Sequence, residues 1–344
     1  MRGLKYGLRQ CMGWAAAAAA AFLVCNALVF FYHHPAGWIE RDSSATDAIW
    51  KPGSTLRMGT EGCGVYTVDQ RGYLNPELPL ADTYTLAVGS SFVQGKEVPL
   101  GSRFTDLLNA ALTDSADELA VYNVSQDGFY FPDIVTCFPA LLQEFPGAKS
   151  IVIEISSTDF SAAELTQALE QKAFDPAQTG GNIWGQLTLS QKLTLWVKEA
   201  FPALSLAKSQ MAAISAKETG TASDSSELPA EEDIAPVLET VLKTLRGEFD
   251  GQLIILYHPG VQIESDGTMT ILREESSQVF AEACRENDIL FVDVSGDFLR
   301  AYEEDFSVPY GHQDGTMGSG HFNEDGHRIV AEALLPVLEG GDPA

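Results

Sequence analysis

The sequence predicts an α/β protein, a three-layer sandwich with a mostly parallel central sheet, preceded by one transmembrane helix. Short and nearly continuous apolar runs are typical of strands buried on both faces of a sheet. These runs alternate with segments in which apolar residues recur at helical spacing, and this alternation is typical of a parallel sheet covered by helices. An apolar run that follows a basic N-terminus predicts the membrane helix.

The expected strands and helices follow one another after residue 82. Strands are expected at 83–88, 119–124, 149–156, 252–257 and 289–294, and helices at 103–113, 132–145, 276–287 and 327–338. Residues 171–233 show no strand pattern and are expected to be an insertion, with an apolar helix at 187–200 and a disordered segment at 215–233. The predicted organisation is an anchor at 1–32, a connector with a small hairpin (62–75) at 33–82, and the α/β domain at 83–344.

The N-terminal segment is apolar from Trp14 to Tyr32, interrupted only by Asn26, and it follows the basic residues Arg2, Lys5 and Arg9. At about 1.5 Å per residue this run is about 28 Å long, which is enough to cross the core of a bilayer. Basic residues on the N-terminal side predict that this end lies in the cytoplasm, so that the main domain lies outside. A cleaved signal peptide is the alternative interpretation, but the sequence lacks a convincing small-x-small cleavage site.

Composition excludes several classes of function. Asp and Glu total 48 against 21 Lys and Arg, a formal net charge of −27. Such acidity argues against binding to nucleic acid and equally against docking on an anionic membrane surface. The five cysteines lack the spacing of a disulfide framework or of metal ligands, and no phosphate-binding loop is evident, so no cofactor or metal is expected.

A turn containing two serines lies between the first expected strand and the helix that follows it. The turn reads Gly89-Ser90-Ser91. At the start of a helix, backbone N–H groups are unpaired and the helix dipole is positive. A serine at this place can attack an acyl carbon while nearby N–H groups stabilise the oxyanion. A plain tight turn is the structural alternative.

Three other polar segments are expected at the same edge of the sheet. They are 123–128 after the second strand, 156–159 after the third, and 318–327 before the last helix. The carboxyl ends of parallel strands open onto one edge, which is where ligands bind in such sheets. Four separate segments therefore converge on one predicted site.

The order and spacing of these segments resemble the SGNH, or GDSL-type, hydrolase superfamily. Gly89-Ser90-Ser91 corresponds to the first block, Gly-Asp-Ser, and Gly128 to the glycine of the second. Residues 156–159 match the third block, Gly-x-Asn-Asp, with Thr158 in place of Asn. In the last block, Asp-x-x-His, the histidine is His321 and the Asp position is Gly318.

The resemblance implies that Ser91 is the nucleophile and His321 its general base. The N–H groups of Ser91 and Gly128 would form the oxyanion hole, with the Thr158 hydroxyl as a weaker third donor. Because Gly318 cannot orient His321, Asp314 or a backbone carbonyl is expected to substitute. Ser90, Asp159 and His258 are expected as pocket or orienting residues. A helix cap for Asp159 and core packing for His258 are the alternatives.

Within the superfamily, the anchor, the hairpin and the ending Gly-Ser-Gly-His-Phe-Asn look similar to membrane-anchored bacterial members that act on cell-surface polysaccharides, such as alginate acetylation domains. The resemblance implies an extracytoplasmic esterase or O-acetyltransferase that uses a Ser–His dyad on acyl, in particular acetyl, esters. A membrane-bound O-acyltransferase would be the partner of a transferase. A catalytically inert glycan-binding or assembly subunit is the alternative, and a purely structural anchor is a third.

Overall fold

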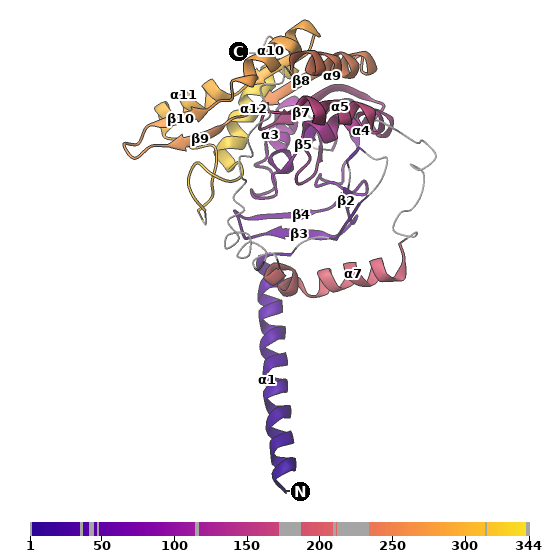
Figure 1. Ribbon diagram of the computed structural model, residues 1–344, viewed down its shortest axis with the longest axis vertical. Coiled ribbons are helices and arrows are strands. Elements are labelled where there is room, and N and C mark those ends of the chain that lie inside the picture. The colour runs from indigo at the N-terminus through magenta and orange to yellow at the C-terminus, as the bar shows by residue number, and fades with distance from the viewer. Residues whose placement is uncertain are drawn as a thin grey trace.

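A five-stranded parallel sheet forms the centre of the computed structural model, which describes residues 2–34, 37–40, 45–46, 48–113, 117–171, 187–208, 211, 234–313 and 315–341 (Figure 1). The strand order is β11-β8-β7-β5-β6, and every neighbouring pair is parallel. The strands are β5 (Leu80–Gly89), β6 (Leu119–Ser125), β7 (Ala148–Ile155), β8 (Gln252–Tyr257) and β11 (Leu290–Asp293). The predicted α/β fold class is confirmed.

Helices cover both faces of this sheet. One layer contains α4 (Phe131–Glu144), α5 (Ala162–Glu170), α9 (Ala235–Glu248) and α10 (Ser276–Glu286), and the other contains α3 (Phe104–Leu112), α11 (Ser295–Asp305) and α12 (Glu324–Leu338). Successive side chains of a strand point to opposite faces. Accordingly, Leu86 and Ile153 belong to one buried cluster and Ala87 and Val152 to the other.

Two short antiparallel sheets precede the main sheet. They pair β1 (Trp38–Glu40) with β2 (Ala48–Trp50), and β3 (Thr55–Met58) with β4 (Gly64–Thr67). The hairpin predicted at 62–75 is therefore misplaced, because its first strand lies in the segment that was expected to be connector. Strand β3 has one buried residue, Leu56, and is too short to show a two-residue alternation. It packs with Tyr66, Val68 and Leu74 in a small core of its own.

Two features lie apart from the sheet. Helix α1 (Arg2–Tyr32) projects from the domain, and its residues Arg9–Tyr32 are long and apolar enough to cross a membrane, as a signal sequence also is (Figure 1). Helix α7 (Leu189–Ala200) lies where the sequence predicted an apolar helix.

The segment 215–233, which was predicted to be disordered, lies outside the described residues. A hairpin that was not predicted, β9 (Gly260–Ile263) and β10 (Met269–Leu272), follows β8.

Candidate active site

Ser91 is the first residue of a four-residue helix, α2 (Ser91–Gln94), which begins directly after β5. Ser90 caps this helix, because its Oγ accepts a hydrogen bond from the Phe92 N–H at 3.3 Å. The turn is so tight that a Cβ on Gly89 would lie 2.5 Å from Glu154 Oε2 and 2.6 Å from Val93 Cγ2. Only glycine fits at position 89, and this sharp change of direction places Ser91 at the carboxyl end of the sheet.

The Ser91 hydroxyl and the His321 ring are in contact, as the sequence predicted. The distance from Ser91 Oγ to His321 Nε2 is 2.8 Å. His321 lies just before α12, where the Asn323 side chain caps the helix by accepting a hydrogen bond from the Gly326 N–H at 3.0 Å. The helix cap thus fixes the backbone from which the imidazole reaches the serine.

The acid that orients His321 is Glu61, from the loop between β3 and β4. Its Oε2 lies 2.8 Å from His321 Nδ1, and its Oε1 accepts the His321 backbone N–H at 2.7 Å. A carboxylate accepts hydrogen bonds only, so it favours the tautomer with the proton on Nδ1 and the lone pair of Nε2 directed at Ser91. The three side chains therefore form a Ser–His–Glu arrangement instead of the expected dyad.

Glu61 takes the role that was expected of Asp314 or a backbone carbonyl. Asp314 itself lies outside the described residues. Glu61 precedes the serine in the chain and belongs to none of the four blocks, so motif spacing gave no sign of it. The approach is close: Gly320 has φ +88°, and a Cβ there would lie 2.4 Å from Glu61 Oε1. Gly320 thus leaves room for the acid.

The loop that carries Glu61 is held against the segment that follows α2. The Cys63 N–H donates to the Glu97 carbonyl at 2.7 Å, and the Tyr66 hydroxyl donates to the Gly95 carbonyl at 3.0 Å. Gly62, with φ +64°, approaches so closely that a Cβ would lie 2.1 Å from the same Glu97 oxygen. The small hairpin is therefore a structural part of the site.

A second acid, Glu97, lies beside the same histidine. Its Oε1 is 3.8 Å from His321 Nδ1, and its side chain is 1% exposed. Burial raises the pKa of Glu97 to about 7, although the charges of His321 and Lys96 act in the opposite direction. Glu97 is thus a buried carboxyl group with a pKa near neutral pH next to the His321 ring.

The two carboxylates change the pKa of the histidine, and the histidine changes theirs. Burial by itself would lower the pKa of His321, but the hydrogen bond to Glu61 and the charges of Glu97 and Glu61 raise it above 6.5 overall. The hydrogen bond from His321 lowers the pKa of Glu61 to about 2. Glu61 is therefore ionised at neutral pH, and its charge favours the protonated form of the His321 imidazole.

Ser90 and His258 form a separate buried network, centred on Glu154. The N–H and Oγ of Ser90 donate to Glu154 Oε2 at 2.7 and 2.8 Å, and His258 Nε2 lies 2.7 Å from Glu154 Oε1. The Phe92 ring contacts both histidines, with its centroid 4.5 Å from that of His258 and 5.3 Å from that of His321. Ser90 and His258 both bond to Glu154, and neither orients His321. The expectation that one of them is an orienting residue is therefore wrong.

Gly128 lies in the turn after β6 with φ +69°, a conformation that favours glycine. The Gln126 N–H donates to the Gly89 carbonyl at 3.1 Å, which ties this turn to the serine turn. Thr158 differs from its expected role as an oxyanion donor. Its hydroxyl, 0% exposed, donates to Glu274 Oε2 at 2.9 Å, and that bond uses the proton an oxyanion would need.

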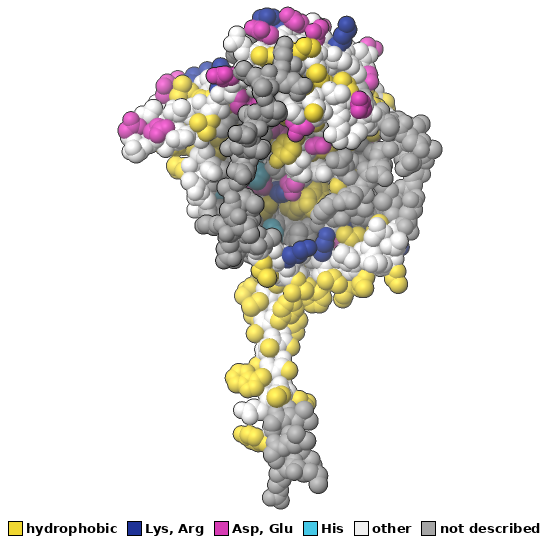
Figure 2. Space-filling view, viewed as in Figure 1, with side chains coloured by type: hydrophobic (Ala, Val, Ile, Leu, Met, Phe, Trp, Pro, Cys, Tyr) yellow, Lys and Arg dark blue, Asp and Glu magenta, His cyan; other side chains and the backbone are white. Residues whose placement is uncertain are grey.

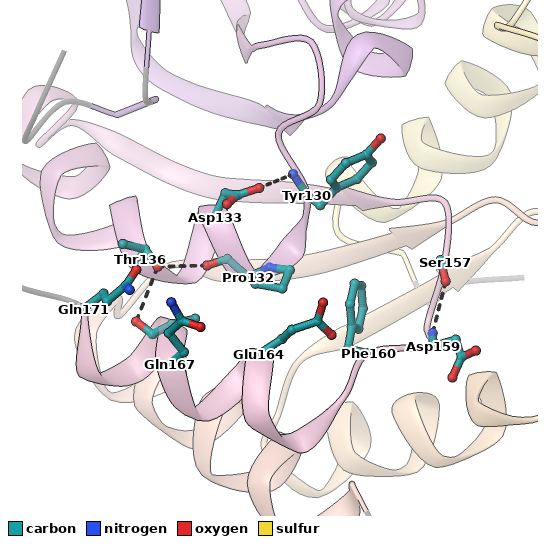
Figure 3. A pocket seen from close by; sticks show the side chains of 11 residues that line it. Tyr130, Pro132, Asp133, Thr136, Ser157, Asp159, Phe160, Glu164, Gln167 and Gln171 are labelled. Atoms are coloured by element: carbon teal, nitrogen blue, oxygen red, sulfur yellow. Dashed lines mark hydrogen bonds between the residues drawn. The ribbon is translucent and has the colours of Figure 1, made fainter. Parts of the chain in front are cut away.

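A cavity of about 440 Å³ opens between the start of α4, the loop after β7 and α5 (Figure 3). Asp159 lines this cavity, whose lining does not include Ser91, His321 or Gly128, so the prediction that Asp159 belongs to the active-site pocket stays a prediction. Two aromatic rings, Tyr130 and Phe160, share its wall with carboxylate, amide and hydroxyl groups, which include Glu164 and Gln167. Among the described residues, no three His, Cys, Asp or Glu side chains are grouped as metal ligands.

Comparison with known proteins finds distant structural likeness only. No protein-family model and no curated protein matches the chain. Solved structures that resemble it include TesA, with 15% identity over 75% of this chain and 98% of that one and a TM-score of 0.37. A variant of Axe2, an acetyl xylan esterase from Geobacillus stearothermophilus, has 14% identity over 78% and 99% and a TM-score of 0.38. The esterase EstA from Pseudoalteromonas sp. has 8% identity over 76% and 98% and a TM-score of 0.39. A functional assignment therefore depends on the site itself.

Proposed function

We propose that this chain is a serine esterase or O-acyltransferase of the SGNH type. The observation that carries the proposal is the continuous contact of Ser91 with His321 and of His321 with Glu61. His321 Nε2 takes the proton of Ser91 Oγ as that oxygen bonds to the ester carbonyl carbon, and Glu61 stabilises the resulting imidazolium. The imidazolium then gives its proton to the departing alkoxide, which leaves an acyl group on Ser91.

Release of the acyl group repeats these steps in reverse. Water or a sugar hydroxyl gives its proton to His321 as its oxygen attacks the acyl-serine. The proton then passes to Ser91 Oγ as the acyl–oxygen bond breaks. Water as acceptor makes the protein an esterase, and a sugar hydroxyl makes it a transferase. We assign the oxyanion hole to the N–H groups of Ser91 and Gly128. Removing one donor of this kind lowers kcat by about 10²–10³-fold.

The proposed substrate is an acetyl ester of a polysaccharide. Supporting this, the 440 Å³ cavity combines the aromatic rings of Tyr130 and Phe160 with many hydrogen-bonding groups. Sugars present apolar C–H faces that pack on aromatic rings, and hydroxyl groups that need polar partners. The loops that form the cavity follow β6 and β7, the same strands whose ends carry Gly128 and Thr158.

Acetate release tests the proposal directly. The full chain in detergent micelles is expected to release acetate from an acetylated oligosaccharide, because the serine, base and acid are already in contact. With an unacetylated sugar added, a transferase would also give an acetylated acceptor detectable by mass spectrometry. Absence of both products, with the acyl-supplying membrane-bound O-acyltransferase either omitted or present, would favour the inert glycan-binding or assembly subunit.

We also propose that α1 anchors the chain with the main domain outside the cytoplasm. Its basic end and apolar length support this orientation. A reporter that is active only in the cytoplasm, fused after the last residue, is expected to be silent, whereas one active only outside should work. The opposite pattern would contradict the orientation and, with it, a cell-surface substrate.

A further inference from the structure

Helix α7 has an exposed apolar face. Leu189, Leu193 and Trp196 are 84%, 57% and 57% exposed, and Val197 is also exposed. At 100° per residue these side chains lie on one side of the helix, and Gln191 lies about 180° from their centre. A contiguous row of large apolar side chains exposed to water is typical of a surface that binds a partner or a membrane.

The domain contacts a different side of α7. Leu195 is buried, and a Cβ on Gly37 would lie 3.1 Å from its Cδ2. Glu199 accepts hydrogen bonds from Lys51 Nζ at 2.8 Å. Leu195 and Glu199 hold the helix to the domain, while Leu193 and Trp196 stay more than half exposed, although the Trp196 ring also contacts Phe201 at 6.0 Å between centroids.

The end of α7 is joined to the transmembrane segment at Asn26. The Asn26 amide donates to the Ala200 carbonyl at 2.9 Å, and its oxygen accepts the Ala203 N–H at 3.2 Å. The rings of Phe22 and Phe201 are 5.9 Å apart. A polar side chain within an apolar span needs such partners. Asn26 lies about 9 Å along the helix axis from Tyr32, so α7 meets α1 inside the apolar run rather than above it.

We propose that α7 lies in the surface of the bilayer that α1 spans, with its apolar face among the lipid chains. In Figure 1, α7 runs across the end of α1, and in Figure 2 the hydrophobic underside of the domain continues into the hydrophobic surface of α1. This continuity with a membrane-spanning surface identifies the occupant as lipid rather than a second copy of the chain. Amphipathic helices of this kind lie in the plane of the interface.

Charge on the adjacent surface fits lipid headgroups. A cavity of about 480 Å³ between α1, α7 and the β2–β3 turn is lined by Lys51, Arg57 and His34. The Arg57 guanidinium lies 5.4 Å from the centre of the Phe30 ring, near the outer end of α1. Glu199 also lines this cavity and pairs with Lys51 at 2.8 Å, so the local attraction to headgroup phosphate, against a net charge of −27, is assigned to Arg57.

Photo-crosslinking of the full chain in lipid nanodiscs tests the proposal. The photoreactive residue p-benzoylphenylalanine replaces Leu193 on the apolar face, Gln191 on the opposite face, or Leu23 in α1. Lipid adducts are counted by mass spectrometry. We expect position 193 to give adducts at a level similar to position 23, and position 191 to give several-fold fewer.

Two outcomes would overturn the proposal. One is a lipid yield at position 193 no higher than at position 191 while position 23 reacts well, which would place α7 in water. The other is a crosslink from position 193 to a second protein chain, which would make the face a protein interface. The readout is independent of the proposed chemistry, because a chain without esterase activity gives the same adducts.

Discussion

Replacing Ser91 by alanine is expected to lower turnover of an acetyl ester by at least about 10⁴ and to abolish labelling by an organophosphonate. The reason is that Ser91 Oγ, 2.8 Å from His321 Nε2, is the proposed nucleophile, and alanine removes it. Residues that act as one catalytic unit lose nearly the whole effect when any one of them is removed, so His321→Ala should lose a similar amount. Steady-state kinetics and intact-protein mass spectrometry measure the two results.

Ser90→Ala is the matched control for this experiment, because the two serines are neighbours in one turn. The Ser90 hydroxyl is bonded to Glu154 and has no contact with His321 among the bonds described. The variant should keep its labelling and much of its turnover, and it should lose some stability, since the cap of α2 is removed. Phosphonate attached to Ser90 in the wild-type chain, located by peptide mapping, would contradict the assignment.

Glu61→Gln is expected to lower kcat by about 10⁴, the loss that follows when the orienting Asp of a serine protease triad becomes Asn. The backbone N–H and the Nδ1 of His321 meet different oxygens of Glu61, so a glutamine would have to present its NH2 group, which cannot accept, to one of them. Glu97→Gln is the control, because Glu97 is also close to Nδ1 but at 3.8 Å makes no hydrogen bond to it. It should cost much less. Equal losses in the two variants would mean that Glu61 does not orient the histidine.

The pH profile separates orientation from simple damage to the fold. General-base catalysis needs neutral His321, whose pKa is raised above 6.5, so kcat/KM should fall as the pH drops through that raised value. Glu61→Gln removes the hydrogen bond that raises this pKa, so the acid limb should move to lower pH. Glu97→Gln should move it in the same direction by removing a charge. An unchanged limb in both variants would show that His321 is not the group that titrates.

The sequence was sufficient for the parts of the molecule that have a local pattern. The central strands are continuous apolar runs, so β5, β7 and β8 were found close to their true bounds. Ser91 and His321 stand in recognisable turns beside such strands and helices. Glu61 has no such pattern, because its role depends on a partner 260 residues away. Thr158 was misjudged for a similar reason, since Glu274, which takes its proton, lies 116 residues away.

The position of Glu61 has a consequence for synthesis of the chain. Glu61 leaves the ribosome first, Ser91 next, and His321 last of the three. The strand that leads to the serine can pair with its neighbours long before His321 exists, but the serine then has no group to take its proton. The proposed nucleophile therefore has no base while the chain is being elongated, and a chain that stops before His321 carries Ser91 without the group that would take its proton.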